Sequence, residues 1–271
     1  MKLKVLIIVF NIVLLTVFFT MLSFSFFTVG TEFIGSFFKN YWIFILFFLF
    51  FLIGINIFFI KNWKLITVLE AEDWPALSLY LETEIFKKRR FTSKKIRLLC
   101  EISILLGDFE TLNRLERMLE EYKPKYIHIF ATRFAAAKVL LNDYDELAEF
   151  STHLIAQRRP LSPWIYFYEA FSAQMLKRYR EAAEKFWAML KTQKEPLIRL
   201  LGIYFIDCGL RAYLDIDKDE VKKQIDTEKD SLRKHPLPYW EKYAQKEKQE
   251  IHILVLTKAI DEALIWLFKE E

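Results

Sequence analysis

The stretch LLGDFETL, residues 105–112, returns in altered form at a fixed interval along this chain of 271 residues. Thirty-five residues later the sequence reads LLNDYDEL, residues 140–147, and thirty-five further on it reads MLKRYREA, residues 175–182. Each copy has an apolar pair, two polar or turn-forming residues, an aromatic residue, and Leu or Ala three positions after it. A period of about 20–50 residues indicates a stacked array of supersecondary units, so we expect a repeat protein.

Other positions keep the same register around the repeated aromatic residue. The aromatic residues are Phe109, Tyr144 and Tyr179, with Trp74 one interval earlier. A small residue lies nine positions before the last three, at Cys100, Ala135 and Ala170, and a proline follows each of them, at Pro124, Pro160 and Pro196. Small residues let paired helices approach closely, and proline ends a helix. The register therefore predicts repeated helix–turn–helix units.

The helices and the turn of each unit have their own signals. Helical spacing before the aromatic puts one set of residues on a common face: Ile96, Leu99 and Cys100 in one unit, and Phe130, Phe134, Ala135 and Lys138 in the next. Gly107-Asp108, Asn142-Asp143 and Lys177-Arg178 mark the turns. Asp108 and Asp143 are predicted to cap the helices that follow them.

At these residues the chain resembles the tetratricopeptide repeat (TPR) family, whose pattern is a small residue, an aromatic, a second small residue and a late proline. The matches in register are Cys100, Phe109 and Pro124, then Ala135 with Tyr144, and Ala170 with Tyr179. The resemblance covers about residues 61–196. It departs from the family in its period of 35 rather than 34, and in Leu77, Leu112 and Leu147 where Ala is usual. It implies an α-solenoid whose first helices line a binding surface.

Pentatricopeptide repeats share the 35-residue period and bind RNA, so they are the main alternative. Residues 61–271 carry 36 of the 39 basic residues and 34 of the 35 acidic ones, a net charge of about +2. Nucleic-acid binding needs a strong positive field. This near-neutral charge weighs against RNA as the partner.

Two uncharged segments near the N-terminus, residues 5–31 and 40–60, are each long enough to cross a bilayer, which takes about 20 apolar residues. We expect transmembrane helices at about 5–27 and 41–60. The alternative for the first is a cleaved signal peptide, whose apolar region is shorter than this one. Lys2 and Lys4 precede the first helix, and Lys61 and Lys64 follow the second. The positive-inside rule therefore predicts a multi-pass protein of the inner membrane, with its N-terminus and repeat domain in the cytoplasm.

Asn11 and Asn56 would lie at similar depth in such a hairpin. A hydrogen bond between them would join the two helices; the alternative is that both stay hydrated near the headgroups. Neither span contains a charged residue, which argues against a transporter. The layout is similar to bacterial membrane-anchored TPR proteins of the HemY type. Residues 61–71 are predicted to continue the second membrane helix into the first repeat without a break.

After Pro196 the period fails. Residues 197–271 are predicted to form helices that cap the array, and the amphipathic segment 251–268 is either the last cap or a helix that docks a partner. The predicted fold is therefore all-α, with a transmembrane helical hairpin over 1–60, a TPR-like α-solenoid over 61–196 and C-terminal capping helices over 197–271.

The sequence contains no set of residues that points to catalysis. Six glycines form no phosphate-binding loop, four histidines lack metal-ligand spacing, and the two cysteines have neither metal-like nor redox-like neighbours. We therefore expect no enzyme activity, no cofactor and no metal. Glu with Lys or Arg at helical pair spacing, as in EAAEK at 181–185, is expected to form a solvated, ion-paired face.

The remaining candidates are binding surfaces. The TPR resemblance implies a basic and aromatic strip for a protein partner, made by Lys94, Arg97, Ile129, Arg133, Trp164, Tyr168 and Phe171. The alternative for residues 164–171 is that they are core, packed under the C-terminal helices. The cations Lys87, Lys88, Arg89 and Arg90 are predicted to contact anionic headgroups of the lipid bilayer; the alternative is an exposed, merely solvated loop.

The predicted function is a membrane-anchored scaffold that binds or recruits a protein partner at the cytoplasmic face of the inner membrane. The first alternative is a structural subunit of a membrane-embedded machine, where the array packs as a homo- or hetero-oligomer. The second is an RNA-binding repeat protein, although nucleic acid is not the expected partner.

Overall fold

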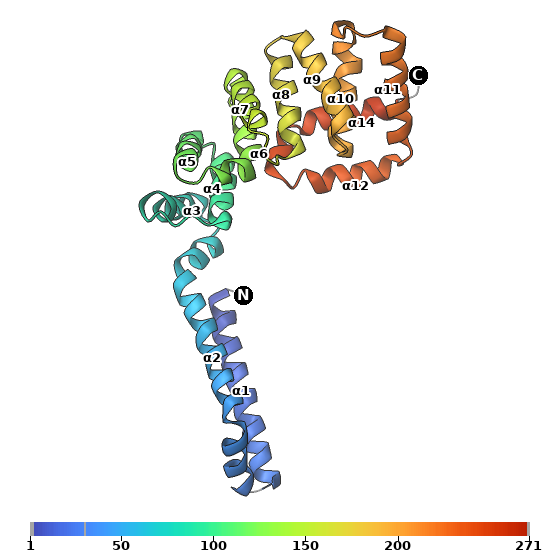
Figure 1. Ribbon diagram of the computed structural model, residues 1–271. Helices are drawn as coiled ribbons and strands as arrows, with labels where there is room; N and C mark the ends of the chain where they lie inside the picture. Colours follow the sequence, from blue (N-terminus) through green and yellow to red (C-terminus); the bar gives the residue numbers. More distant parts are fainter. Residues whose placement is uncertain (1–2, 30, 270–271) are drawn as a thin grey trace. The chain divides into compact units, whose positions relative to one another are not determined.

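A computed structural model describes residues 3–29 and 31–269, and these residues form helices joined by short turns, with no strand among them (Figure 1). The all-α prediction is thus confirmed for the described part of the chain. Contacts divide the chain into two compact units, Met1–Arg90 and Phe91–Glu271. The predicted hairpin segment, residues 1–60, lies within the first unit.

The first unit is built on two long helices. α1 (Leu3–Val29) and α2 (Thr31–Glu70) pack side by side, and α3 (Trp74–Glu82) packs on α2 and continues into the π-helical turn η1 (Thr83–Lys87) (Figure 1). α2 is one unbroken helix of 40 residues, as predicted for the passage from the apolar segment into the first repeat. Asn56 Nδ2 donates to Asn11 Oδ1 at 2.9 Å, and Asn11 Nδ2 donates to Asn56 Oδ1 at 3.3 Å. The two amides therefore link the helices.

Part of α2 has the length and apolar composition of a membrane span. Among the described residues, Leu46–Glu70 is the one helix that meets both criteria, and Ile7–Thr20 in α1 is a shorter apolar helix. Phe47, Phe50 and Ile60 are 69%, 78% and 71% exposed. A large exposed apolar surface marks contact with a membrane or a partner.

The second unit begins with six helices that follow one another with short turns. They are α4 (Ser93–Leu106), α5 (Phe109–Tyr122), α6 (Lys125–Leu140), α7 (Tyr144–Ala156), α8 (Pro163–Met175) and α9 (Tyr179–Thr192). Each packs on the next, and α4, α6 and α8 also pack on one another in sequence. The predicted helix–turn–helix units are thus present, with the first helix of each unit in one row and the second helix beside it.

The turn inside each unit has the same backbone geometry every 35 residues. Positive φ angles occur at Glu72 (51°), Gly107 (68°), Asn142 (56°) and Lys177 (61°). Such angles are uncommon outside glycine and asparagine, so their recurrence at one interval identifies a repeated corner. The residue after each is the N-cap of the next helix.

Aspartate supplies the cap at three of these corners. The backbone N–H groups of Ala76, Thr111 and Glu146 donate to the carboxylates of the preceding caps, at Asp73, Asp108 and Asp143. The caps predicted at Asp108 and Asp143 are thus confirmed. Arg178 occupies the fourth position and makes no such side-chain bond.

The small and apolar repeat positions form the core between the helices. Cys100, Ala135 and Ala170 are fully buried, as are Leu147 and Ala182. The repeated aromatic residues lie nearer the surface, and Tyr179 is 38% exposed. Small buried residues on the first helices therefore set the close helix packing, whereas the aromatics cover the corners.

The C-terminal helices return over the row of first helices rather than extending it. After α10 (Pro196–Phe205), η2 (Ile206–Leu210) and η3 (Arg211–Tyr213) come α11 (Lys218–Arg233), α12 (Leu237–Glu247), α13 (Ile251–Leu254) and α14 (Thr257–Phe268). α14 packs on α10, α11 and α12, and α13 packs on α6 (Figure 1). The amphipathic segment predicted as one helix is thus two, and Leu254, the last residue of α13, is 54% exposed.

We expect Asp143→Ala to lower the free energy of unfolding by about 1 kcal/mol, because the backbone N–H of Glu146 loses its acceptor. Asp143→Asn keeps an oxygen at the cap and is the matched control. Thermal unfolding of the full-length chain in detergent, followed by circular dichroism, measures both variants. Equal losses from the two substitutions would argue against the capping role.

Candidate functional site

The predicted basic and aromatic strip is largely covered by residues 250–268, which comprise α13, α14 and the residue before them. We call these residues the C-terminal segment. Arg133, Trp164 and Tyr168 are 7%, 6% and 0% exposed. Arg133 Nη2 lies 3.1 Å from Glu250 Oε2, the Tyr168 hydroxyl donates to the backbone carbonyl of His252, and the Trp164 and His252 rings meet edge to face. Of the two alternatives for the aromatic strip, the structure places these residues in the core.

The rest of the strip is dispersed. Arg97 is exposed but pairs with Glu101 at 2.8 Å and with Glu250 at 3.5 Å. Phe171 is half-buried and stacks on Phe167. Lys94 and Ile129 are exposed. The seven residues therefore do not form one open surface, because the C-terminal segment lies over Arg133, Trp164 and Tyr168.

His252 is an unusual member of this interface. Its side chain is buried, and neither ring nitrogen has a hydrogen-bond partner among the described residues. Burial, reinforced by the positive charge of Arg133, lowers the pKa of His252 to about 4. The imidazole is therefore neutral at physiological pH, which lets it pack against the Trp164 ring.

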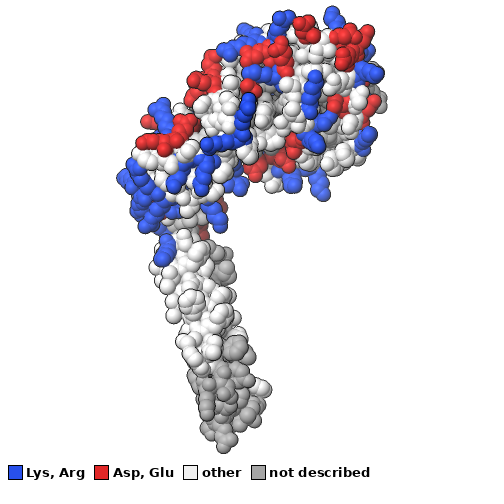
Figure 2. All heavy atoms as spheres, in the orientation of Figure 1, with Lys and Arg blue, Asp and Glu red and all other residues white. Residues whose placement is uncertain are grey.

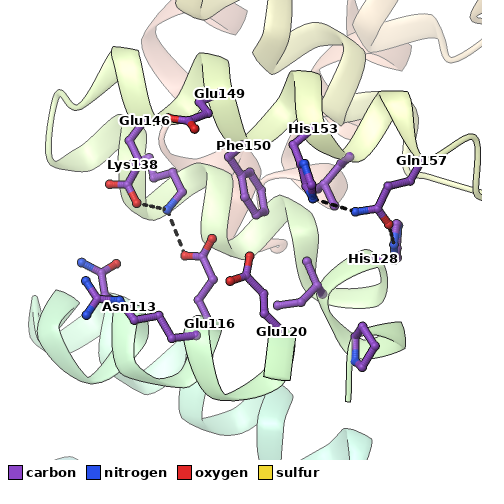
Figure 3. A pocket seen from close by; sticks show the side chains of 14 residues that line it. Asn113, Glu116, Glu120, His128, Lys138, Glu146, Glu149, Phe150, His153 and Gln157 are labelled. Atoms are coloured by element: carbon purple, nitrogen blue, oxygen red, sulfur yellow. Dashed lines mark hydrogen bonds and ion pairs between the residues drawn. The ribbon is translucent and has the colours of Figure 1, made fainter. Parts of the chain in front are cut away.

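An open groove lies among α5, α6 and α7, away from the predicted strip (Figure 3). Its volume is about 650 Å³. The lining comes from four residues of α5 (Asn113, Glu116, Arg117, Glu120), from Pro124, Ile127, His128 and Lys138, and from six residues at 146–157. We call this surface the outer groove.

Lys138 crosses the interior of the outer groove with almost no exposure to solvent. Its side chain is 2% exposed, and its Nζ lies 2.9 Å from Glu116 Oε2 on α5 and 2.9 Å from Glu146 Oε1 on α7 (Figure 3). Burial acts to lower the pKa of Lys138, but the two carboxylates outweigh burial and raise it. The buried ammonium group thus holds three helices together.

A second set of hydrogen-bonded polar side chains lies at the other end of the outer groove, opposite the Lys138 ion pairs. His128 Nε2 and Gln157 Oε1 are 2.8 Å apart, and Gln157 Nε2 lies 2.9 Å from His153 Nε2 (Figure 3). Phe150 points into the space between the Lys138 ion pairs and this set of hydrogen-bonded side chains (Figure 3). The groove therefore combines an apolar middle with hydrogen-bonded ends, as ligand sites commonly do.

The charges on the groove do not form a metal site. Among the described residues no group of three or more His, Cys, Asp or Glu side chains has suitable geometry. Over the second unit, acidic and basic side chains are interspersed, whereas the described part of the long helices is uncharged for most of its length (Figure 2).

Sequence reasoning missed the outer groove. Its acidic residues have helical spacing, which predicts a solvated, ion-paired face rather than a groove. One signal was available: Lys138 falls on the same predicted helix face as Phe134 and Ala135. A lysine on a buried face requires a carboxylate partner, and that requirement pointed to an acidic neighbour.

The predicted membrane-surface cations lie at the end of the first unit. Lys87, Lys88, Arg89 and Arg90 are all exposed. Lys88 Nζ lies 2.7 Å and Arg90 Nη1 3.6 Å from the buried carboxylate of Glu84. Glu84 thus offsets part of this charge, and the run keeps an excess of positive charge. Its contact with lipid remains a prediction.

Two comparisons relate the chain to proteins of Treponema. The family model described as "Uncharacterised Treponema protein" matches residues 111–269, which include the lining of the outer groove and the C-terminal segment. A protein of Treponema pallidum (strain Nichols), described as "Uncharacterized protein", is 33% identical over 244 residues, covering 85% of this chain and 76% of the relative. No solved structure matches the chain.

Lys138→Met is expected to lower the free energy of unfolding by about 3–5 kcal/mol, because Glu116 keeps a buried charge without its partner. The double variant Lys138→Met/Glu116→Leu removes both charges and should recover most of this loss. Chemical denaturation of the full-length chain in detergent measures both. A double variant as unstable as the single one would show that the buried pair is not the cause.

Stability should also fall as the pH decreases from about 6.5 to about 4. The pKa of His252 is about 4 in the folded chain against 6.5 in the reference state, so in this window the unfolded chain binds a proton that the folded chain does not. Stability is therefore complete above the unfolded pKa and is lost as the pH falls.

His252→Phe keeps a ring against Trp164 and removes this titration. The difference in melting temperature between about pH 7 and about pH 4.5 is expected to shrink in this variant. An identical pH dependence in the two proteins would assign the effect to other groups.

Proposed function

This chain belongs to the family described as uncharacterised Treponema protein, and we propose that it is a membrane-anchored helical-repeat scaffold. In this proposal the chain binds a protein partner at the cytoplasmic face of the inner membrane. Three features support it: the apolar helices of the first unit, the repeated corners, and the outer groove of the second unit.

The proposed anchor is a transmembrane hairpin formed by α1 and α2. The outward Phe and Ile side chains of α2 suit a hydrocarbon environment, and Leu46–Glu70 has the length of a span. The paired Asn11 and Asn56 amides satisfy each other, as polar groups within a bilayer must. Exposed cations at Lys87–Arg90 would contact anionic headgroups on the cytoplasmic side.

The proposed repeat architecture is a TPR-like solenoid. The corner at intervals of 35 residues and the row of first helices support it. Solenoids present extended surfaces that bind other proteins. Because the C-terminal segment covers the predicted inner strip, the proposal assigns partner binding to the outer groove.

The single observation that carries the proposal is the outer groove itself. It combines about 650 Å³ of open space, an apolar middle and hydrogen-bonded ends. A structural subunit of a membrane machine is the second candidate. It is favoured by the unbroken α2, which couples the apolar segment to the first repeat without a flexible linker.

A site-specific crosslinking experiment tests the proposal. A photo-crosslinking amino acid replaces Arg117 at the outer groove, or Glu184, which is exposed on α9 outside the groove, in the full-length chain in bacterial cells. We expect a defined protein adduct from position 117 and none from position 184. Adducts that are absent from 117, or identical at both positions, would contradict the groove as the binding surface.

The anchor is tested separately in the same cells. The full-length chain should remain in the membrane pellet after washing with alkaline carbonate, because an integral span is not released by removing electrostatic contacts. Release of the chain into the supernatant would contradict the transmembrane hairpin.

A further inference from the structure

The outer groove has negative charge that the chain itself does not neutralise. Lys138 is already shared between Glu116 and Glu146. Glu120 and Glu149 also line the groove, and neither has an ion-pair or hydrogen-bond partner among the described residues. Arg117 is the second cation of the lining, so two cations face four carboxylates, and the groove carries an excess of negative charge.

This excess of negative charge affects the pKa of the buried Glu116 carboxylate at the base of the groove. Burial raises the pKa of Glu116, and the negative charges of Glu120 and Glu146 raise it further against the attraction of Lys138. Glu116 and Glu120 both point into the space below Phe150 (Figure 3). A cation that entered this space would relieve repulsion among the carboxylates.

The shape of the groove suits a long cationic side chain. Ile127, Phe150 and Leu154 supply its apolar wall, and the carboxylates stand beside this wall. Lys and Arg side chains bury their aliphatic stems on apolar surface while the charged head stays among polar groups. An Arg or Lys from another protein would therefore match both parts of the lining.

We propose that the occupant is the basic run of a second copy of this chain, Lys87–Arg90. The run presents four consecutive exposed cations. Lys87 has no partner among the described residues, and Glu84 is the carboxylate that pairs with Lys88 and Arg90. One chain thus carries both an acidic groove and a basic segment, and the two are complementary in charge.

The inference rests on the proposed function, because copies anchored in one membrane are confined to a thin layer. Confinement raises the effective concentration of one copy for another, which strengthens contacts that are weak between freely diffusing proteins. A groove-to-run contact joins two different surfaces, so each copy can offer its groove to one neighbour and its run to another. Two copies that exchange such contacts reciprocally form a two-fold dimer, and one-way contacts build rings or open chains.

A charge-reversal experiment tests this contact with the full-length chain. Variant one carries Glu120→Lys and Glu149→Lys in the groove, and variant two carries Lys87→Glu and Arg90→Glu in the run. Two tagged pools are placed in neutral phosphatidylcholine vesicles, and energy transfer between the tags reports self-association. Neutral lipid is used because anionic headgroups would compete for the run.

Each variant alone is expected to self-associate at least about tenfold more weakly than wild type, because variant one sets a basic groove against the basic run and variant two cancels the net charge of the run. Mixing the two variants should restore association, because the unaltered run of variant one then meets the unaltered groove of variant two. The control, Glu121→Lys with Glu184→Lys, reverses two exposed carboxylates outside the groove and should leave association unchanged.

Two results would overturn the proposal. The first is self-association that is absent in wild type or equal in wild type and both variants. The second is a mixture of variants that associates no better than either one alone, which would mean that groove and run do not meet. Both leave the proposed scaffold intact, because crosslinking from position 117 to another protein and retention in carbonate-washed membranes are measured independently.

Discussion

The C-terminal segment covers the face formed by the row of first helices, α4, α6 and α8, which we call the inner face. The rest of the second unit depends on this closure. Tyr168 donates to the carbonyl of His252, and Arg133 is shared by Glu101 and Glu250. These bonds satisfy polar groups that burial would otherwise leave unpaired. Because this face is closed, an external partner has to use another surface, and the outer groove among α5, α6 and α7 is an open concave surface.

The repeated corner prepares the face that the C-terminal segment covers. A left-handed residue followed by a capping residue reverses the chain in the same way in each unit, so the first helices come to lie in a row. Buried small residues, Ala135 and Ala170 among them, let this row pack closely. The outer groove arises from the same repetition, because α5 and α7 occupy equivalent places in neighbouring units with α6 between them.

The sequence predicted the helices, the corners and the caps because each of these depends on residues close together in the chain. Asp143, for example, caps an amide only three residues away. The two features that decide the candidate site are long-range. Glu250 is 117 residues from Arg133, and Lys138 meets carboxylates on two other helices. An amphipathic segment can cap the end of an array or cover its face, and periodicity does not distinguish these arrangements.

Hydrogen exchange on the full-length chain in detergent tests the central claim most directly. If the C-terminal segment closes the inner face, the backbone amides of α13 and α14 open together with those of α6, α8 and α10, and all of them exchange slowly. We predict protection of residues 252–267 comparable to that of α8. Exchange of this segment within seconds, with α8 still protected, would mean that the inner face is open and would contradict the account.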